Sequence, residues 1–91
     1  MDVTTATFER DVIEKSHEHP VVVDFWAAWC GPCRALAPAI ESEVAKRSEQ
    51  ILLAKVDVDA ETTIAARYGI QSIPTVAVRA ESSPRARAFG W

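Results

Sequence analysis

Cysteine is scarce in this 91-residue sequence: the chain contains only Cys30 and Cys33. A structural zinc site needs four nitrogen or sulfur ligands, and a second cysteine pair is lacking. The two histidines, His17 and His19, are separated from the cysteines by an apolar segment and fit solvated residues at the end of a helix. The sequence therefore predicts no metal site, and the cysteine pair must work without a third thiol.

Long apolar runs and clusters of basic residues are absent as well. The apolar run near Val21 is far shorter than a membrane span, and ten basic residues are spread along a chain of net charge −3. We therefore expect neither a membrane protein nor a nucleic-acid-binding protein. The first 19 residues carry many charges and no signal-peptide core, so the expected location is cytoplasmic. In that reducing compartment a structural disulfide is not expected, and the pair is interpreted as catalytic or redox-sensing.

Strand and helix patterns alternate, which predicts one α/β domain over residues 1–91. A closing hairpin makes the expected sheet mixed rather than wholly parallel. The first expected element is a helix capped by Thr5 or Thr7 and ending near residues 17–20. A strand at 21–26, a helix at 33–47 and a strand at 51–58 follow. The last expected elements are a short helix capped by Asp59 and ending at Gly69, and strands at 75–79 and 86–89.

The cysteine pair is the first feature that carries chemistry. Cysteines at i and i+3 at the start of a helix are close enough to form a disulfide. The helix N-terminus favours a thiolate on Cys30, and Pro32 suits the first helical position. Cys30 is expected to be the more exposed nucleophile, and Cys33 can then attack the mixed disulfide. The pattern predicts reversible thiol–disulfide exchange.

Asp24 is the second feature, because it is a carboxylate inside an otherwise apolar strand. Burying such a group is costly, and burial should raise its pKa until it can store a proton near neutral pH. Lys55 interrupts the next apolar strand and could be its charge partner. The alternative is a solvated acid on an edge strand.

Pro74, in Ile73-Pro74-Thr75, is the third feature. A cis bond would expose the backbone of Ile73 for an extended substrate to pair with. A proline before a strand is nevertheless commonest with a trans bond, so these residues by themselves favour trans.

Together these segments resemble the thioredoxin family. The resemblance extends from Phe8 to Gly90 and is most specific in Val-Asp-Phe-Trp-Ala-Ala-Trp-Cys-Gly-Pro-Cys, in Val-Asp-Val-Asp at 56–59, in Tyr-Gly-Ile at 68–70, and in Ile-Pro-Thr at 73–75. It implies a thioredoxin fold, with a central mixed sheet flanked by helices.

The resemblance also implies a role for each site residue. Cys30 would be the attacking thiol and Cys33 the resolving thiol, with Asp24 as the buried acid and Lys55 beside it. Pro74 would be a cis-proline against the disulfide, which reverses the unaided preference for trans. The apolar docking surface would consist of Trp29, Gly31, Pro32, Ile73 and Gly90.

The end of the sequence departs from the family pattern. The family continues after the position of Gly90 with an amphipathic C-terminal helix, and the printed sequence stops at Trp91. Without that helix one face of the sheet would lose cover. We therefore expect marginal stability or self-association through that face.

The leading functional prediction is a protein disulfide reductase that needs no cofactor besides its own redox-active disulfide. The implied partners are a thioredoxin reductase and disulfide-containing protein substrates. One alternative is a disulfide oxidase or isomerase, although the Gly-Pro between the cysteines favours the reducing members of the family. Another is a thioredoxin-like binding or chaperone module without significant turnover.

Overall fold

The computed structural model describes residues 1–81. The expected turn at 82–84, the strand expected at 86–89 and Gly90 lie outside the described residues. Within residues 1–81, no helix is both long enough and apolar enough to span a membrane.

A mixed three-stranded sheet forms the centre of the described structure, as predicted. Its strands are β1 (Val21–Trp26), β2 (Leu52–Asp57) and β3 (Thr75–Arg79), in the order β2-β1-β3. The central strand β1 pairs in parallel with β2 and antiparallel with β3. The amino-terminal segment adds a bridge between Asp2 and Lys55 at the outer edge of β2. The run of β-branched residues in β1 suits a strand that is covered on both faces.

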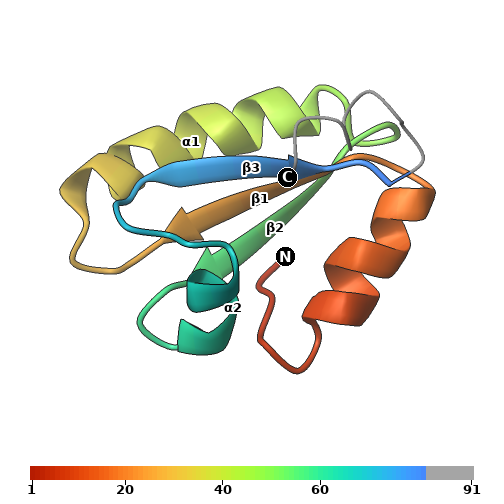
Figure 1. Ribbon diagram of the computed structural model, residues 1–91. Helices are drawn as coiled ribbons and strands as arrows, with labels where there is room; N and C mark the ends of the chain where they lie inside the picture. The colour runs from red at the N-terminus through yellow and green to blue at the C-terminus, as the bar shows by residue number, and fades with distance from the viewer. Residues whose placement is uncertain (82–91) are drawn as a thin grey trace.

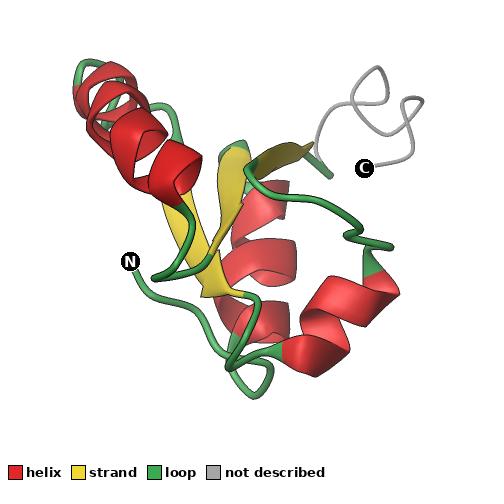
Figure 2. Ribbon diagram, turned by 90° about the vertical axis from the view of Figure 1, so that its left-hand side faces the viewer, coloured by secondary structure: helices red, strands yellow, loops and turns green. Residues whose placement is uncertain are grey.

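Helices lie on both faces of this sheet (Figure 1; Figure 2). Helix α1 (Gly31–Ala45) covers one face, and Pro38 lies within it without ending it. The other face carries two short helices near the amino terminus and one further helix. These are the π-helix η1 (Glu9–Glu14), the 3-10 helix η2 (Lys15–His17) and the α-helix α2 (Thr62–Arg67).

Two predicted helix caps are wrong. The first helical segment has Phe8, not Thr5 or Thr7, at its N-cap, and no side chain caps it. In the turn that precedes it, the Thr4 hydroxyl accepts from the Thr7 backbone N–H. Helix α2 begins after Glu61 rather than after Asp59. Gly69 does end this helical segment, at φ +63°, as expected.

The two faces of β1 bury different kinds of side chain. Val21, Val23 and Phe25 are fully buried in the main core with Phe8, Val12 and Ile64. The ring of Tyr68 packs against both Phe8 and Phe25, with ring centroids 5.5 Å apart in each pair. The opposite face, under α1, carries Val22, Asp24 and Trp26 because side chains alternate along a strand.

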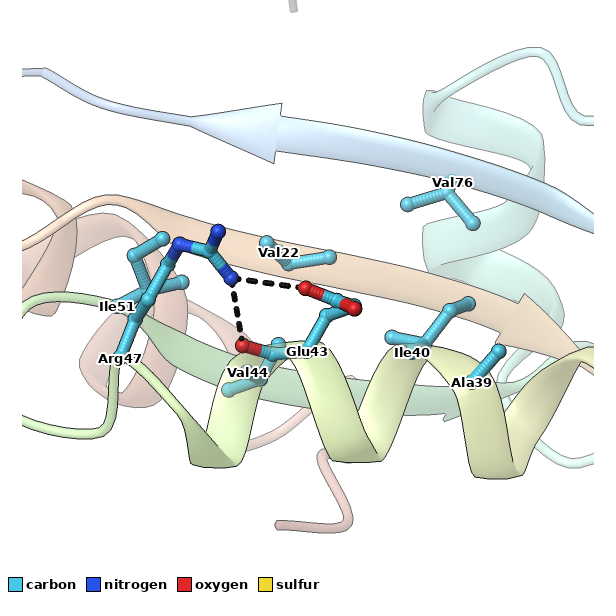
Figure 3. A pocket seen from close by; sticks show the side chains of 8 residues that line it. All are labelled: Val22, Ala39, Ile40, Glu43, Val44, Arg47, Ile51 and Val76. Carbon is cyan, nitrogen blue, oxygen red and sulfur yellow. Dashed lines mark hydrogen bonds and ion pairs between the residues drawn. The ribbon is translucent and has the colours of Figure 1, made fainter.

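Helix α1 packs more loosely against its face of the sheet. Cys33 is its one buried residue. Towards the other end of the helix an apolar groove of about 370 Å³ lies between the helix and the sheet (Figure 3). It is lined by Val22, Ala39, Ile40, Glu43, Val44, Arg47, Ile51 and Val76.

Candidate redox site

The two cysteines meet at the start of α1, where they form a disulfide with Cα atoms 5.2 Å apart. Cys30 is the N-cap residue and has an extended backbone, at φ −85° and ψ 102°. Its Sγ accepts a hydrogen bond from the Cys33 backbone N–H at 3.2 Å. An N-cap acceptor satisfies one of the N–H groups that a helix leaves unpaired at its first turn. The sulfur of Cys30 therefore lies where a helix stabilises negative charge.

Exposure does not distinguish the two sulfur-bearing residues, and the expectation that Cys30 is the more exposed is wrong. Both cysteines are 3% exposed. They pack with Ala27 in a small cluster that Trp26 and Ile73 cover in part. The loop from Ala27 to Cys30 folds back through a hydrogen bond from Cys30 N–H to Ala27 O.

The Ile73–Pro74 peptide bond is cis. This confirms the bond implied by the family resemblance and contradicts the trans bond that the local residues favoured. Ile73 packs against the main core and against the cysteine cluster, whereas Pro74 is exposed. The sequence near Pro74 could not settle the isomer, because long-range packing rather than local preference selects it.

Asp24 is buried, 3% exposed, on the face of β1 beneath α1. Its burial raises the pKa of the carboxyl above the ordinary value of 3.8, as predicted; the positive charge of Lys55 opposes the shift and Glu41 adds to it. A carboxyl with a raised pKa can keep its proton closer to neutral pH than a surface acid.

Lys55 is paired with Asp24 in the parallel register of β1 and β2. Its Nζ nevertheless lies over the ring of Trp26, 5.3 Å from the centroid. This is a cation–π contact. Lys55 therefore affects Asp24 through the electric field of its charge, from the neighbouring position in the strand register. Its ammonium group also contacts the ring of Trp26, which packs against the cysteine cluster.

Trp29 is a large hydrophobic side chain next to the disulfide and is 66% exposed. Its indole Nε1 donates a 2.7 Å hydrogen bond to Asp59 Oδ2 in the loop after β2. Gly31 and Pro32 are exposed on the same turn. Sequence reasoning singled out both Trp29 and Asp59, but it gave Asp59 a capping role and missed this contact. The pairing joins two segments 30 residues apart, and no local pattern indicates it.

Arg34 is a residue that sequence reasoning did not single out. Its Nη1 donates to the carbonyl oxygen of Ala28, in the loop that precedes Cys30. Its own backbone N–H donates to Cys30 O at 3.2 Å. Both ends of Arg34 are therefore bonded to the segment that carries the disulfide.

Within residues 1–81, no three side chains of the kinds that bind metals come together into a group that could hold an ion. His17 and His19 are both exposed. The candidate chemistry of the described site is that of the cysteine pair, with one buried acid on the strand that precedes it and exposed apolar and aromatic groups around it.

Comparison with known proteins connects this geometry to a family. The family model described as "Thioredoxin" matches residues 1–90. The chain is 47% identical over 76 residues to thioredoxin 1 of Synechococcus elongatus, which covers 84% of this chain and 69% of the relative. It is 41% identical over 88 residues to thioredoxin of Mycobacterium tuberculosis, covering 97% of this chain and 74% of the relative.

A further relative combines two activities in its name. The chain is 40% identical over 90 residues to the bifunctional thioredoxin reductase/thioredoxin of Mycobacterium leprae, which covers 99% of this chain and 19% of that protein.

Proposed function

Since the chain belongs to the thioredoxin family and is a disulfide reductase that works through its Cys-x-x-Cys pair, we propose that Cys30 is the attacking thiol and Cys33 the resolving thiol. The observation that carries this assignment is the hydrogen bond from Cys33 N–H to Cys30 Sγ at the N-terminus of α1. A donor and a helix terminus that both face one sulfur favour the thiolate on that cysteine. Cys33 lies inside the helix and has the second attack as its role.

The reaction then proceeds in two exchanges. The Cys30 thiolate attacks one sulfur of a substrate disulfide, forms a mixed disulfide and releases the first substrate thiolate. Cys33, as its thiolate, attacks Cys30 Sγ, closes the Cys30–Cys33 disulfide and releases the second substrate thiolate. Two electrons pass from the dithiol to the substrate, and both substrate thiolates take up protons.

Asp24 has the role of proton acceptor for Cys33 in this proposal. Burial raises the pKa of its carboxyl, so the carboxylate is a stronger base than that of a solvated aspartate. Lys55 has a supporting role, since its positive charge limits that rise. It thereby keeps Asp24 able to act as a base.

The substrate-docking surface is proposed to consist of the exposed groups around the disulfide. Trp29, Gly31, Pro32 and Pro74 are exposed, and Ile73 packs beside the cysteine cluster. Gly90, which the family resemblance adds to this surface, lies outside the described residues. An apolar rim of this kind suits an extended segment of a protein substrate.

The electron donor is proposed to be a thioredoxin reductase. The Mycobacterium leprae relative has both names in one chain, which supports a functional coupling of the two proteins. We propose one domain over residues 1–91 and the reducing cytoplasm as its location, where such a donor keeps the dithiol available.

Self-association is also proposed, through the groove between α1 and the sheet. The groove is apolar along its length, and Glu43 and Arg47 lie beside it (Figure 3). In a dimer with a two-fold axis, the apolar groove of one copy would face the apolar groove of the other. The same axis would bring the acidic residue of each copy opposite the basic residue of its partner. Glu43 of each copy could then pair with Arg47 of the other.

Insulin reduction with dithiothreitol tests the proposed roles when it is measured for the unchanged chain and for C30S and C33S. Both variants are expected to lose turnover, but only C33S should accumulate a mixed disulfide with a substrate, which mass spectrometry locates on Cys30. A trapped substrate on Cys33 in C30S would reverse the assignment. Unchanged turnover in C30S would exclude the exchange mechanism and leave a binding or chaperone module.

A further inference from the structure

Arg34 holds a position that neither the disulfide chemistry nor the packing of the core explains. It is exposed on the first turns of α1, four residues after Cys30. A positive side chain near a helix N-terminus is electrostatically unfavourable for the helix itself. The first turn of α1 carries no acidic residue that would offset it.

The charge of Arg34 has no carboxylate partner among residues 1–81. Five other basic side chains of this part of the chain are in ion pairs with carboxylates: Arg10, Lys15, Lys46, Arg47 and Arg79. Lys55 lies over the ring of Trp26. Arg34 therefore differs from most cations of the described structure, and it belongs to the helix that carries the disulfide.

The guanidinium of Arg34 is held in place although it lacks an ionic partner. One of its nitrogens donates to Ala28 O, the carbonyl that directly precedes the exposed residue Trp29. Guanidinium has five N–H donors in a planar fork, so one bond to a carbonyl leaves the others for a second acceptor. A side chain that is already ordered loses less entropy when it binds.

We propose that Arg34 binds a carboxylate of the protein substrate that lies next to the reacting cysteine, so that the reductase prefers disulfides with acidic neighbours. The inference rests on the proposed function of Cys30 and names a substrate class for the same site. The remaining Arg34 N–H groups match the two oxygens of a carboxylate. Asp59, in the loop after β2, already accepts from the Trp29 indole.

The size of the preference follows from the exposure of the site. Exposed ion pairs contribute little, and a single one corresponds to a preference of about two- to fivefold. Salt should reduce this preference because exposed charges are screened. Arg34 is thus a specificity-determining residue and is not required for the exchange itself.

The test uses three disulfide peptides that differ only at the two positions flanking the reacting cysteine, which hold Glu, Gln or Lys. The rate constant for reduction of each peptide by the reduced protein is measured at low and at high salt. The unchanged chain is expected to reduce the Glu peptide about two- to fivefold faster than the Gln peptide, and the Lys peptide most slowly. The R34Q variant should reduce the three peptides at similar rates, and R34K should retain part of the preference.

Arg67 provides a control on the other face of the sheet. It is an exposed arginine in the last turn of α2. The R67Q variant should keep the preference of the unchanged chain. Equal rates for the Glu and Gln peptides with the unchanged chain, or an undiminished preference in R34Q, would overturn the proposal. If the exchange mechanism itself were wrong, the unchanged chain would reduce none of the peptides. That result can be told apart from a failure of the Arg34 proposal, in which all three peptides are reduced.

Discussion

Asp24 and Lys55 occupy paired positions on the parallel strands β1 and β2, yet the Lys55 ammonium lies over the ring of Trp26. The buried carboxyl therefore has a nearby positive charge that opposes its desolvation only in part, and its pKa remains raised. Asp24, the proposed proton acceptor, lies on the face of β1 beneath α1. Its register partner Lys55 belongs to β2, and the outer edge of β2 binds the amino-terminal segment through the bridge to Asp2.

Replacement of Asp24 by Asn is expected to stabilise the fold at neutral pH by about 1–3 kcal/mol, because the charge no longer has to be buried. The folded-state pKa lies above the ordinary value of 3.8, so the folded chain holds a proton that the unfolded chain has lost. Stability of the unchanged chain should therefore fall as the pH rises from about 3.8 through the raised pKa. Urea unfolding at several pH values in this range should show that the free energy of unfolding decreases with pH in the unchanged chain. In D24N this decrease should be absent.

Asp11 provides the control for this experiment. Its hydrogen bond with Arg10 lowers the pKa of its carboxyl, which is the opposite direction. The D11N variant should gain no stability at neutral pH. A D24N protein that is less stable than the unchanged chain at neutral pH would contradict the cost assigned to the buried charge.

The hydrogen bond between Trp29 and Asp59 is expected to hold the exposed indole in position for substrate. Both W29F and D59A remove the 2.7 Å contact and should raise the KM for insulin more than they lower kcat. A double-mutant cycle on unfolding should give a coupling of about 0.5–1.5 kcal/mol, the net value of one hydrogen bond. Strictly additive effects of the two replacements would show that the contact contributes nothing in solution.

Of the two glycines within residues 1–81, Gly69 is expected to be the one whose replacement destabilises the fold. It has φ +63° after α2, and a side chain there is strained even though nothing lies within 4 Å of the added Cβ. G69A should lose about 1–2 kcal/mol of unfolding free energy. Gly31, at the start of α1, also has open space but no positive φ. G31A should therefore be neutral or slightly more stable, and equal losses in both variants would contradict the explanation.

Sedimentation should reveal association of copies that depends on concentration if the groove between α1 and the sheet is a contact surface. Ile40 lies on the groove side of α1, between Ala39 and Glu43 in the lining (Figure 3). I40K should shift the equilibrium to the monomer, since a charged side chain would have to be buried in the apolar contact. S42K changes an exposed residue of the same helix that does not line the groove, and it should leave the equilibrium unchanged. A monomer at every concentration of the unchanged chain would exclude the contact.

Local patterns predicted much of the fold. The expected strand at 21–26 matches β1, the strand at 75–79 matches β3, and β2 lies within the strand expected at 51–58. These segments are apolar and rich in β-branched residues, so neighbours in the chain already define them. The cysteine spacing likewise predicted the disulfide at the start of a helix, because i and i+3 lie on one turn.

Predictions that required long-range contacts were less successful. The trans preference at Pro74 and the greater exposure of Cys30 were wrong. Ile73 and Cys30 both take part in the buried cysteine cluster, and the local sequence does not indicate these contacts. The cap assigned to Asp59 was wrong because a turn held by the Asp57 carboxylate occupies residues 57–60, and α2 begins only after Glu61.

By itself the sequence determined the chemistry: an isolated pair of cysteines on one helical turn, after a strand that contains an acid, specifies thiol–disulfide exchange. The tertiary structure decided what surrounds that chemistry. It set the cis bond at Pro74, the place of the Lys55 ammonium over Trp26, and the contacts of Trp29 and Arg34. The physical reason is distance along the chain: backbone preferences act over a few residues, whereas isomer choice, desolvation and polar contacts depend on groups that only folding brings together.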